Sequence, residues 1–554
     1  MSSFFGLNVA SNGLFTAQRG LDVVNHNINN VNTPGYSRQM SVQEALPAMF
    51  LLNGTGMLGT GSHSIAVERI HDDYLDYKYW AESDTYGEWC VKATLMSDIE
   101  KAFNEPSDSG FNKVINNFFT AVQELAKDPS SLAVRKLLIG EGMTLSKYFN
   151  SLADHLEKLQ SDINYNVKIK VDEINSYGKQ IQQLNKQIFA AEIDGNKAND
   201  LRDKRTYLVD KLSKLINIEA YEVNVGLLPN GQEEKHFMIT INGKAFVDHA
   251  DLTQLKVEQR EKKLNVEEDI ENLYDVVWED GNSLEVRGGE LKGYLDMRDG
   301  NEGANQGNGA SPNYKGVPFY IKKLNEFVRK FALAINEGIT VDIDDSGNAV
   351  YSKTESGHAD GYGLKKPGDT VSPTGIRFFT MSGWSDIQNK KSELYTSEFI
   401  GDAKTVDEIG SLYSKLTAKN FSVSGELIHD KNSEYNVAAS SVSGLSEDGS
   451  NLLRIIDMRH NGHLFMEGTP EDFMKSLISM MGIDAQQAYQ FTNTQEVIIN
   501  QITNRRLSVQ GVSLNEEMAN MVRYQHAYTA AAKMISTLDA IYDTLVNRVG
   551  IIGR

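Results

Sequence analysis

The sequence contains very little cysteine, little proline and no long hydrophobic run. Cys90 is the only cysteine among 554 residues, which excludes an intramolecular disulfide and any metal site held by several cysteines. We expect Cys90 to be a small core side chain. No segment approaches the roughly 18–20 apolar residues of a membrane-spanning helix, and Met1–Gly6 lack the start of a cleavable signal peptide. The sequence therefore predicts a cytoplasmic protein, or one exported without cleavage.

Positive charge is also scarce. Lys and Arg total 55 against 75 Asp and Glu, which gives a formal net charge of −20. This sign disfavours nucleic acid and anionic membranes as partners, because both attract a positive surface. The charge is unevenly spread: residues 1–43 carry a net +1, residues 500–554 carry a net +2, and the segment between them carries −23.

The composition is otherwise that of a folded protein, with 40% hydrophobic and 23% charged residues. A chain of this length is expected to form three or four domains, because single cores stop growing well below 554 residues.

Both ends of the chain carry apolar residues at alternating spacings of three and four, the heptad pattern of a coiled-coil helix. The N-terminal series is Leu7, Ala10, Leu14, Ala17, Leu21, Val24, Ile28 and Val31. The C-terminal series is Leu514, Met521, Tyr524, Tyr528, Ala531, Ile535, Leu538, Tyr542, Leu545 and Val549, interrupted only at Glu517. We predict that the first helix ends at Thr33-Pro34-Gly35, and that Ser513 and Glu516 open the second as a capping box.

We predict that these two helices pair with each other and with copies on neighbouring subunits. Each series is only a stripe, so a single pairing leaves flanking apolar side chains such as Phe15 and Ile541 in need of another partner. The alternative is that they are two edge helices of an ordinary core.

The predicted fold class is α+β and multidomain, with inserted β-rich domains. Residues 143–192 predict one helix roughly 75 Å long, and shorter helices are expected at 199–215, 318–336 and 470–507. Asn242-Gly243 predicts a type I′ hairpin turn, and 276–278 and 284–286 read as strands. The predicted domains are 1–50 with 505–554 (terminal coiled coil), 65–218 with 310–338 and 450–504 (helical rod), 219–300 (first β-rich outer domain), and 339–445 (second β-rich domain).

Three short motifs resemble ligand sites without the expected context. Gly54–Gly59 fits G-x-G-x-x-G, but a strand-like segment follows where a dinucleotide site requires a helix. Asp342–Gly347 imitates an EF-hand loop, yet its twelfth position is Lys353 instead of a glutamate, so a β-turn is favoured. His460 and His463 lack a third metal ligand nearby. We therefore predict no catalytic residues, no metal and no cofactor, and a protein that is not an enzyme.

Several motifs resemble those of a known family. The segments 6–14 and 26–39, the latter ending in Tyr36-Ser37-Arg38-Gln39, are similar to the N-terminal signature of bacterial flagellar axial proteins, and within that group to the hook-associated protein 1 family. Further similarity lies in the segments 184–188, 198–205, 288–299, 334–336, 511–520 and 524–531. The sequence departs from the family pattern at Arg202, Lys204 and Thr206.

The resemblance implies a structural component of the flagellum that joins hook to filament as an assembled ring. The implied partners are identical subunits, the hook protein, a second junction protein on the filament side and an export chaperone. The implied location is extracellular, after export through the flagellar type III system without a cleaved signal peptide. The alternatives are another axial protein (hook or distal rod) and a binding module displayed on the flagellum through 340–440.

The resemblance and the heptads together assign candidate residues. The expected assembly interface consists of Leu7, Leu14, Leu21, Val24, Ile28, Val31, Met521, Tyr528, Ile535, Leu538, Tyr542 and Leu545. The expected motif residues are Asn32, Thr33, Pro34, Gly35 and Tyr36. Asn25, Asn27, Asn29, Asn30 and Asn32 offer amides for bonds between subunits, or alternatively mark the end of the helix.

Overall fold

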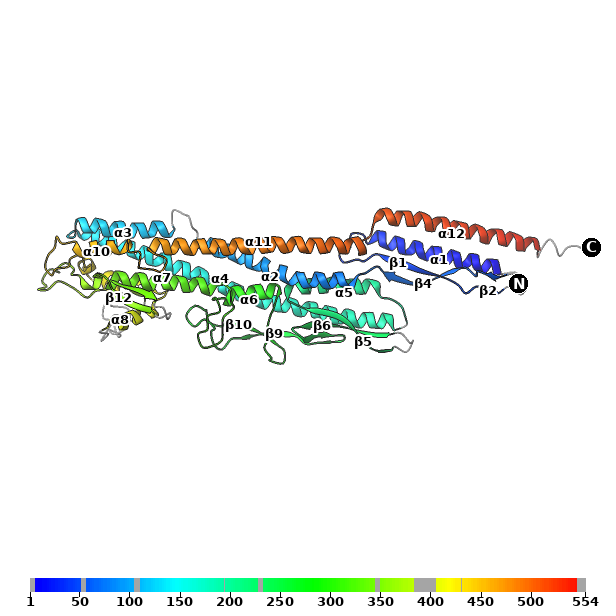
Figure 1. The fold of residues 1–554 in the computed structure, drawn as a ribbon, viewed down its shortest axis with the longest axis horizontal. Helices are drawn as coiled ribbons and strands as arrows, with labels where there is room; N and C mark the ends of the chain where they lie inside the picture. The colour runs from blue at the N-terminus through cyan, green and yellow to red at the C-terminus, as the bar shows by residue number, and fades with distance from the viewer. Residues whose placement is uncertain are drawn as a thin grey trace, which may run out of the picture.

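A computed structural model gives an elongated molecule in which a terminal module is joined end to end with a helical rod (Figure 1). It describes residues 5–50, 56–103, 110–193, 195–227, 233–343, 349–382, 405–429 and 431–545. Long helices and small antiparallel sheets alternate along the chain, which confirms the predicted α+β multidomain class. Within these described ranges, no helix combines the length and apolar character needed to cross a bilayer.

The terminal module, as we call it, comprises residues 5–50, 56–69 and 514–545. The helices α1 (Phe5–Asn29) and α12 (Leu514–Asp543) pack along each other. A β-hairpin lies against α1: β1 (Gln39–Ala45) pairs with β4 (Ser62–Arg69), and β2 (Met49–Phe50) pairs with β3 (Met57–Leu58). The start of α1 and the end of α12 therefore lie at the same end of the molecule (Figure 1).

The rod is built around two very long helices. α4 (Leu132–Glu192) has 61 residues and is about 90 Å long, and α11 (Pro470–Gln510) has 41 residues and packs on α2 (Asp73–Phe103). The other rod helices are α3 (Phe111–Lys127), α5 (Asn199–Leu215), α6 (Gly289–Asp299), α7 (Val317–Glu337) and α10 (Ser450–Arg459). The helix predicted from 143 begins eleven residues earlier, because its glycines do not interrupt it.

The first β module packs on the C-terminal half of α4. Its strands β5 (Glu219–Leu227), β6 (Glu233–Ile241), β7 (Lys244–Asp248) and β8 (Asp251–Leu252) form one antiparallel sheet, and β9 (Leu255–Gln259) pairs with β10 (Tyr274–Trp278). The predicted type I′ turn is confirmed, with φ of 49° at Asn242 and 78° at Gly243. The predicted strand at 284–286 is wrong, because pairing there is limited to one bridge at Ser283.

The second β module packs near the N-terminal end of α4. It contains two two-stranded antiparallel sheets, β11 (Ile339–Ile343) with β12 (Ala349–Lys353) and β13 (Phe379–Met381) with β14 (Phe421–Val423), and two small helices, α8 (Val406–Leu412) and α9 (Gly425–Ile428). Its apolar residues share one continuous core with α3, α7 and α11. The predicted turn at 342–347 falls largely on residues outside the described ranges.

Glycines let both β modules approach α4 closely. A Cβ on Gly142 would lie 2.5 Å from the ring of Phe378 in the second module. A Cβ on Gly178 would lie 2.6 Å from the ring of Phe246 in the first. Each module therefore packs an aromatic ring against the backbone of α4.

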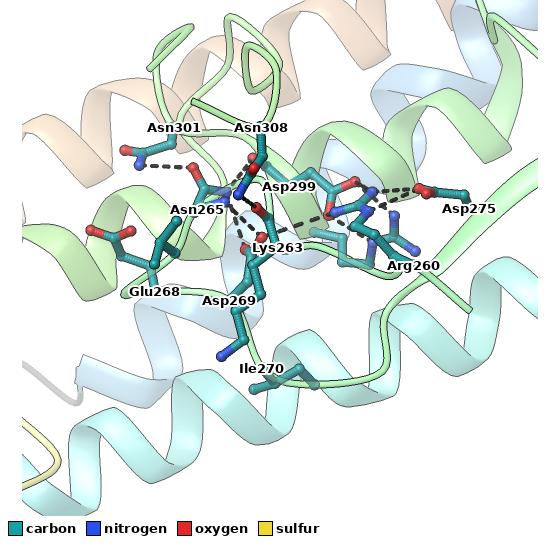
Figure 2. A network of polar contacts seen from close by, with 12 residues as sticks. Arg260, Lys263, Asn265, Glu268, Asp269, Ile270, Asp275, Asp299, Asn301 and Asn308 are labelled. Atoms are coloured by element: carbon teal, nitrogen blue, oxygen red, sulfur yellow. Dashed lines mark hydrogen bonds and ion pairs between the residues drawn. The ribbon is translucent and has the colours of Figure 1, made fainter. Parts of the chain in front are cut away.

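A buried polar network fastens the first β module to the rod (Figure 2). Arg260 forms an ion pair with Asp299 at 2.9 Å, and Asn265 donates to the backbone carbonyl of Asp299 at 3.0 Å. Gln160 of α4 donates to Asp269 at 3.0 Å. Asp269 and Asp299 are almost fully buried, so these contacts compensate carboxylates that would otherwise be costly to bury. The loop between β9 and β10 is thereby held against α4 and α6.

Candidate assembly site at the base of the terminal helices

Three contacts fix how α1 and α12 pair. Gly6 lies beside Leu538, Gly20 beside Tyr524, and the Asn27 amide donates to the Glu517 carboxylate at 3.1 Å. Gly6 and Gly20 are two heptads apart, as are Tyr524 and Leu538, while Gly20 to Asn27 and Glu517 to Tyr524 each span one heptad. The helices are therefore antiparallel and in heptad register.

Most of the expected interface residues lie along this pairing, at varying depth. Val24 is buried, and Leu7, Leu14, Leu21, Ile28, Val31, Met521, Ile535, Leu538 and Tyr542 are half-buried. Tyr528 and Leu545 remain 38% and 54% exposed. Val31 lies beyond the helix, which ends at Asn29, and Val549 lies outside the described residues. Within a single chain, the pairing covers only part of each heptad stripe.

Gly20 makes the close approach of the two helices possible. A Cβ at this position would lie 2.6 Å from the Tyr524 ring. We expect Gly20→Ala to destabilise the pairing by about 1–3 kcal/mol through overpacking, measured as faster hydrogen exchange of the α12 amides. Gly13→Ala is the matched control, because a Cβ on Gly13 meets nothing within 4 Å. It should stabilise α1 by roughly 0.5–1 kcal/mol; similar exchange rates in the two variants would contradict this packing.

The interruption of the C-terminal heptads is the centre of a buried polar cluster. Glu517 is 1% exposed, and its carboxylate accepts from Arg38 Nε at 2.8 Å as well as from Asn27. Asn27, also 1% exposed, donates to the Gln39 carbonyl at 2.9 Å and accepts from the Tyr36 hydroxyl at 2.7 Å and the Gln39 amide at 2.9 Å. All the hydrogen-bonding positions of the Asn27 side chain are used, which makes the arrangement specific.

This cluster corrects two sequence interpretations. Glu516 does not close a capping box with Ser513, whose side chain makes no cap bond; it pairs with Arg38 at 2.6 Å. Asn27 binds within its own chain rather than facing outward, and Asn30 bonds back to the His26 carbonyl as a helix-end residue does. Asn25, Asn29 and Asn32 are exposed. Because a heptad pattern is defined by its apolar positions, it does not indicate that a charged residue such as Glu517 faces inward.

The Thr33–Tyr36 turn is held against α5 of the rod. Gly35 has φ of 77°, and a Cβ there would lie 2.8 Å from Cβ of Tyr207, so a glycine is required on both counts. The backbone amide of Ser37 donates to Asp203 at 2.8 Å. Burial, with Asp200, Asp203 and Glu517 nearby, raises the pKa of Tyr36, so its hydroxyl stays protonated and available as a donor. Asn32, Thr33 and Pro34 remain exposed beside it.

Charged contacts join the terminal module to the rod. Asp203 also forms an ion pair with Arg69 at 3.0 Å, and Asp200 accepts a hydrogen bond from the Gln39 side-chain amide at 2.6 Å. On the rod side, Arg506 of α11 bridges Asp76 at 2.8 Å and Asp210 at 2.9 Å. The rod supplies carboxylates and the terminal module supplies most of the donors.

A groove opens where the two parts meet. This joint groove, as we name it, has a volume of 760 Å³ and is bounded by the exposed Thr33–Gly35 turn, the end of α11 and two rod tyrosines, Tyr79 and Tyr207. The Arg506 guanidinium lies 4.7 Å from the centre of the Tyr79 ring, and Leu507 beside it is 61% exposed. The groove therefore offers aromatic and apolar surface beside the ion-paired Arg506 and the carboxylates of Asp210 and Glu516.

An apolar strip lies on the outer flank of α12. Met534, Ile541 and Leu545 share one helical face and are 56%, 49% and 54% exposed. Phe15 on α1 is 64% exposed. The expectation that one pairing leaves apolar flanks uncovered therefore holds within the single chain.

Two of the ligand-like motifs lie in surroundings unlike those of a ligand site where the structure describes them. β4 follows Gly59, where a dinucleotide site needs a helix, and His460 and His463 are both exposed. Cys90 is half-buried on α2 and not in the fully buried core, which corrects the expectation of a core side chain. The sequence analysis missed one group of possible metal ligands, which consists of His71, Asp73 and Asp76. Asp76 is already paired with His71 at 2.7 Å and with Arg506.

Sequence models of flagellar proteins match three segments of the chain. Residues 96–350 match the sequence model of the flagellar hook-associated protein FlgK helical domain. The ends match two further models: residues 7–36 the flagella basal body rod protein, and residues 504–548 the C-terminal part of the flagellar basal body rod FlgEFG proteins.

Full-length relatives and a solved structure are also similar. Flagellar hook-associated protein 1 of Bacillus subtilis is 28% identical, with all of both chains covered. That of Salmonella typhimurium is 25% identical, with 98% of this chain and 99% of the relative covered. The flagellar hook junction protein FlgK from Burkholderia pseudomallei shares the fold, with a TM-score of 0.51 at 14% identity over 79% of this chain and 100% of that structure.

Proposed function

Because the chain belongs to the flagellar hook-associated protein 1 family, we propose that it joins hook to filament as a ring of identical subunits held together by the terminal modules. The family is one of flagellar structural proteins, so the role at the hook–filament junction is structural and requires no catalytic site. The ring and its contacts with the hook protein and with a second junction protein are the specific content of the proposal.

One observation carries the proposal of assembly. The apolar strip on α12 and Phe15 on α1 are exposed although each lies on a helix already paired inside the chain. Large apolar patches on one module mark surfaces for protein contact. A ring in which each terminal module packs on its neighbours covers these side chains, and the near-neutral charge of the two ends permits this close packing.

Location and export form the second part of the proposal. The protein is a flagellar component, and we infer that it leaves the cell unfolded through the flagellar type III apparatus with the help of an export chaperone. A net charge of −23 on the segment between the two ends suits outer domains that remain in contact with solvent.

Leu538→Asp tests the proposal in cells lacking the wild-type gene. Leu538 is half-buried beside Gly6, so a charge there disrupts the terminal module, while the cores that the rod shares with the β modules lie outside this module. We expect the variant to appear in the medium, with hooks formed but filaments missing. Lys533→Asp, an exposed change on the same helix, should leave filaments intact. Normal filaments on Leu538→Asp cells would reject assembly through the terminal helices.

A further inference from the structure

The end of the terminal module opposite the joint groove carries an exposed apolar tip. Met49, Phe50 and Met57, on the paired strands β2 and β3, are 50%, 79% and 58% exposed. We call the four residues Met49, Phe50, Met57 and Leu58 the hairpin tip. Figure 1 places it beside the start of α1, at the far end from the rod.

The fold of the module explains why the tip stays uncovered. The hairpin arms run along α1: the Ser62 carbonyl accepts from the Thr16 hydroxyl at 3.0 Å, and Gly61 lies beside Val9. From Gly61 toward lower residue numbers, β3 and its partner β2 lie alongside the start of α1 (Figure 1). The tip therefore projects from one end of the module, while the Thr33–Gly35 turn and the joint groove lie at the other.

The groove and the tip are complementary in chemistry. The groove is lined by Tyr79, Tyr207, the Arg506 guanidinium and the exposed Leu507. Tyrosine and arginine are common anchors of protein–protein contacts. Its volume of 760 Å³ accommodates several side chains. The tip offers only apolar side chains and no charge, so its entry leaves the Arg506 ion pairs with Asp76 and Asp210 intact.

We propose that the hairpin tip of one subunit inserts into the joint groove of a second copy of the chain. The two surfaces lie at opposite ends of a module whose first helix is about 37 Å long, so one molecule cannot bring them together. A contact between different surfaces on identical subunits is heterologous, and it closes into a ring or continues as a helix. The proposal rests on the assembled ring of the proposed function and names one of its contacts.

Cysteine cross-linking in assembled flagella tests the contact. The chain carries Phe50→Cys and Leu507→Cys in a Cys90→Ser background, and isolated hook–filament complexes are treated with a short bismaleimide. A head-to-tail contact gives a ladder of covalent multimers, because each subunit offers both partners. The matched control replaces Leu507→Cys by Val497→Cys, which is 67% exposed on the same helix but outside the groove, and should give no ladder.

The other possible outcomes distinguish a failure of this contact from a failure of ring assembly. Dimers from the Phe50→Cys chain alone would indicate a symmetric tip-to-tip contact and overturn the proposal. Adducts with the hook protein, or no adducts in cells that still make filaments, would overturn it as well while leaving the junction role standing.

A second variant keeps the test independent of cross-linking geometry. Phe50→Asp places a charge on a side chain that is 79% exposed in the single chain, so folding is not at issue. We expect about a tenfold or greater loss of filaments, because burial of one phenylalanine changes an association constant by at least that factor. Phe50→Leu should retain filaments. Equal filament numbers in wild type and Phe50→Asp would contradict the insertion.

Discussion

Replacing Glu517 with alanine is expected to destabilise the terminal module by about 3 kcal/mol, because breaking a buried ion pair leaves its partners uncompensated. Glu517 is 1% exposed and binds both Arg38 and Asn27. In Glu517→Ala, Asn27 keeps its bonds to Gln39 and Tyr36, but one of its amide protons points into a site without an acceptor. Hydrogen exchange of the α1 and α12 amides measures the effect, while the amides of α4 should be unaffected.

Glu516→Ala is the matched control. Glu516 pairs with the same arginine at 2.6 Å, but its side chain is 63% exposed. Exposed ion pairs contribute roughly 0–1 kcal/mol, so this variant should exchange nearly as slowly as wild type. Equal effects of the two substitutions would show that burial of Glu517 is not what holds the helices in register.

The second β module is expected to lose stability as the pH falls from about 6.5 to 4, because His358 must remain neutral there. His358 is 1% exposed; its Nδ1 donates to the Ile376 carbonyl at 2.7 Å, and its Nε2 accepts from the Ala438 amide at 2.9 Å. Burial, with a smaller effect of the buried Arg135 cation, lowers the pKa of His358 to about 4.

The direction of the change in stability with pH follows from this lowered pKa. The unfolded chain takes up a proton near pH 6.5 and the folded chain only near pH 4, so the stability contributed by neutral His358 is present above 6.5 and lost between these values. The loss is about 3 kcal/mol over that range. Denaturant unfolding of wild type and His358→Gln at several pH values isolates it, because the remaining carboxylates titrate in both proteins.

His460→Gln controls for histidine titration in general, since His460 is exposed. Its stability should follow wild type at every pH. A constant difference between wild type and His358→Gln from neutral pH down to about pH 4 would show that His358 does not carry the acid sensitivity.

The sequence was sufficient to locate the terminal helices but not to set their register. Apolar periodicity is a local signal, so α1 and α12 were predictable from spacing alone. The register depends on Gly20, Asn27 and Glu517, which a search for apolar stripes treats as interruptions. The charged residue in an otherwise apolar series was the available signal, because a carboxylate at a core position needs a partner.

The start of the long helix was predicted too late. α4 begins at Leu132 and includes Gly140 and Gly142, although glycine weakens an isolated helix. In the folded chain, Gly142 is where the Phe378 ring meets the backbone, and packing outweighs propensity. The joint groove and the hairpin tip could not be predicted either, because both depend on which ends of distant segments come to lie together.

The pairing of α1 with α12 also sets an order of folding. Asn27 and Glu517 are 490 residues apart in sequence, so their contact closes a loop that contains the entire rod. α2 and α11, which continue directly from the terminal module, pack on each other inside the rod, and their meeting brings the two ends of the chain close. We therefore expect the rod to form first and to hold the two ends close enough to pair. On the export route that we propose, α1 and α12 cannot pair until both have left the export channel.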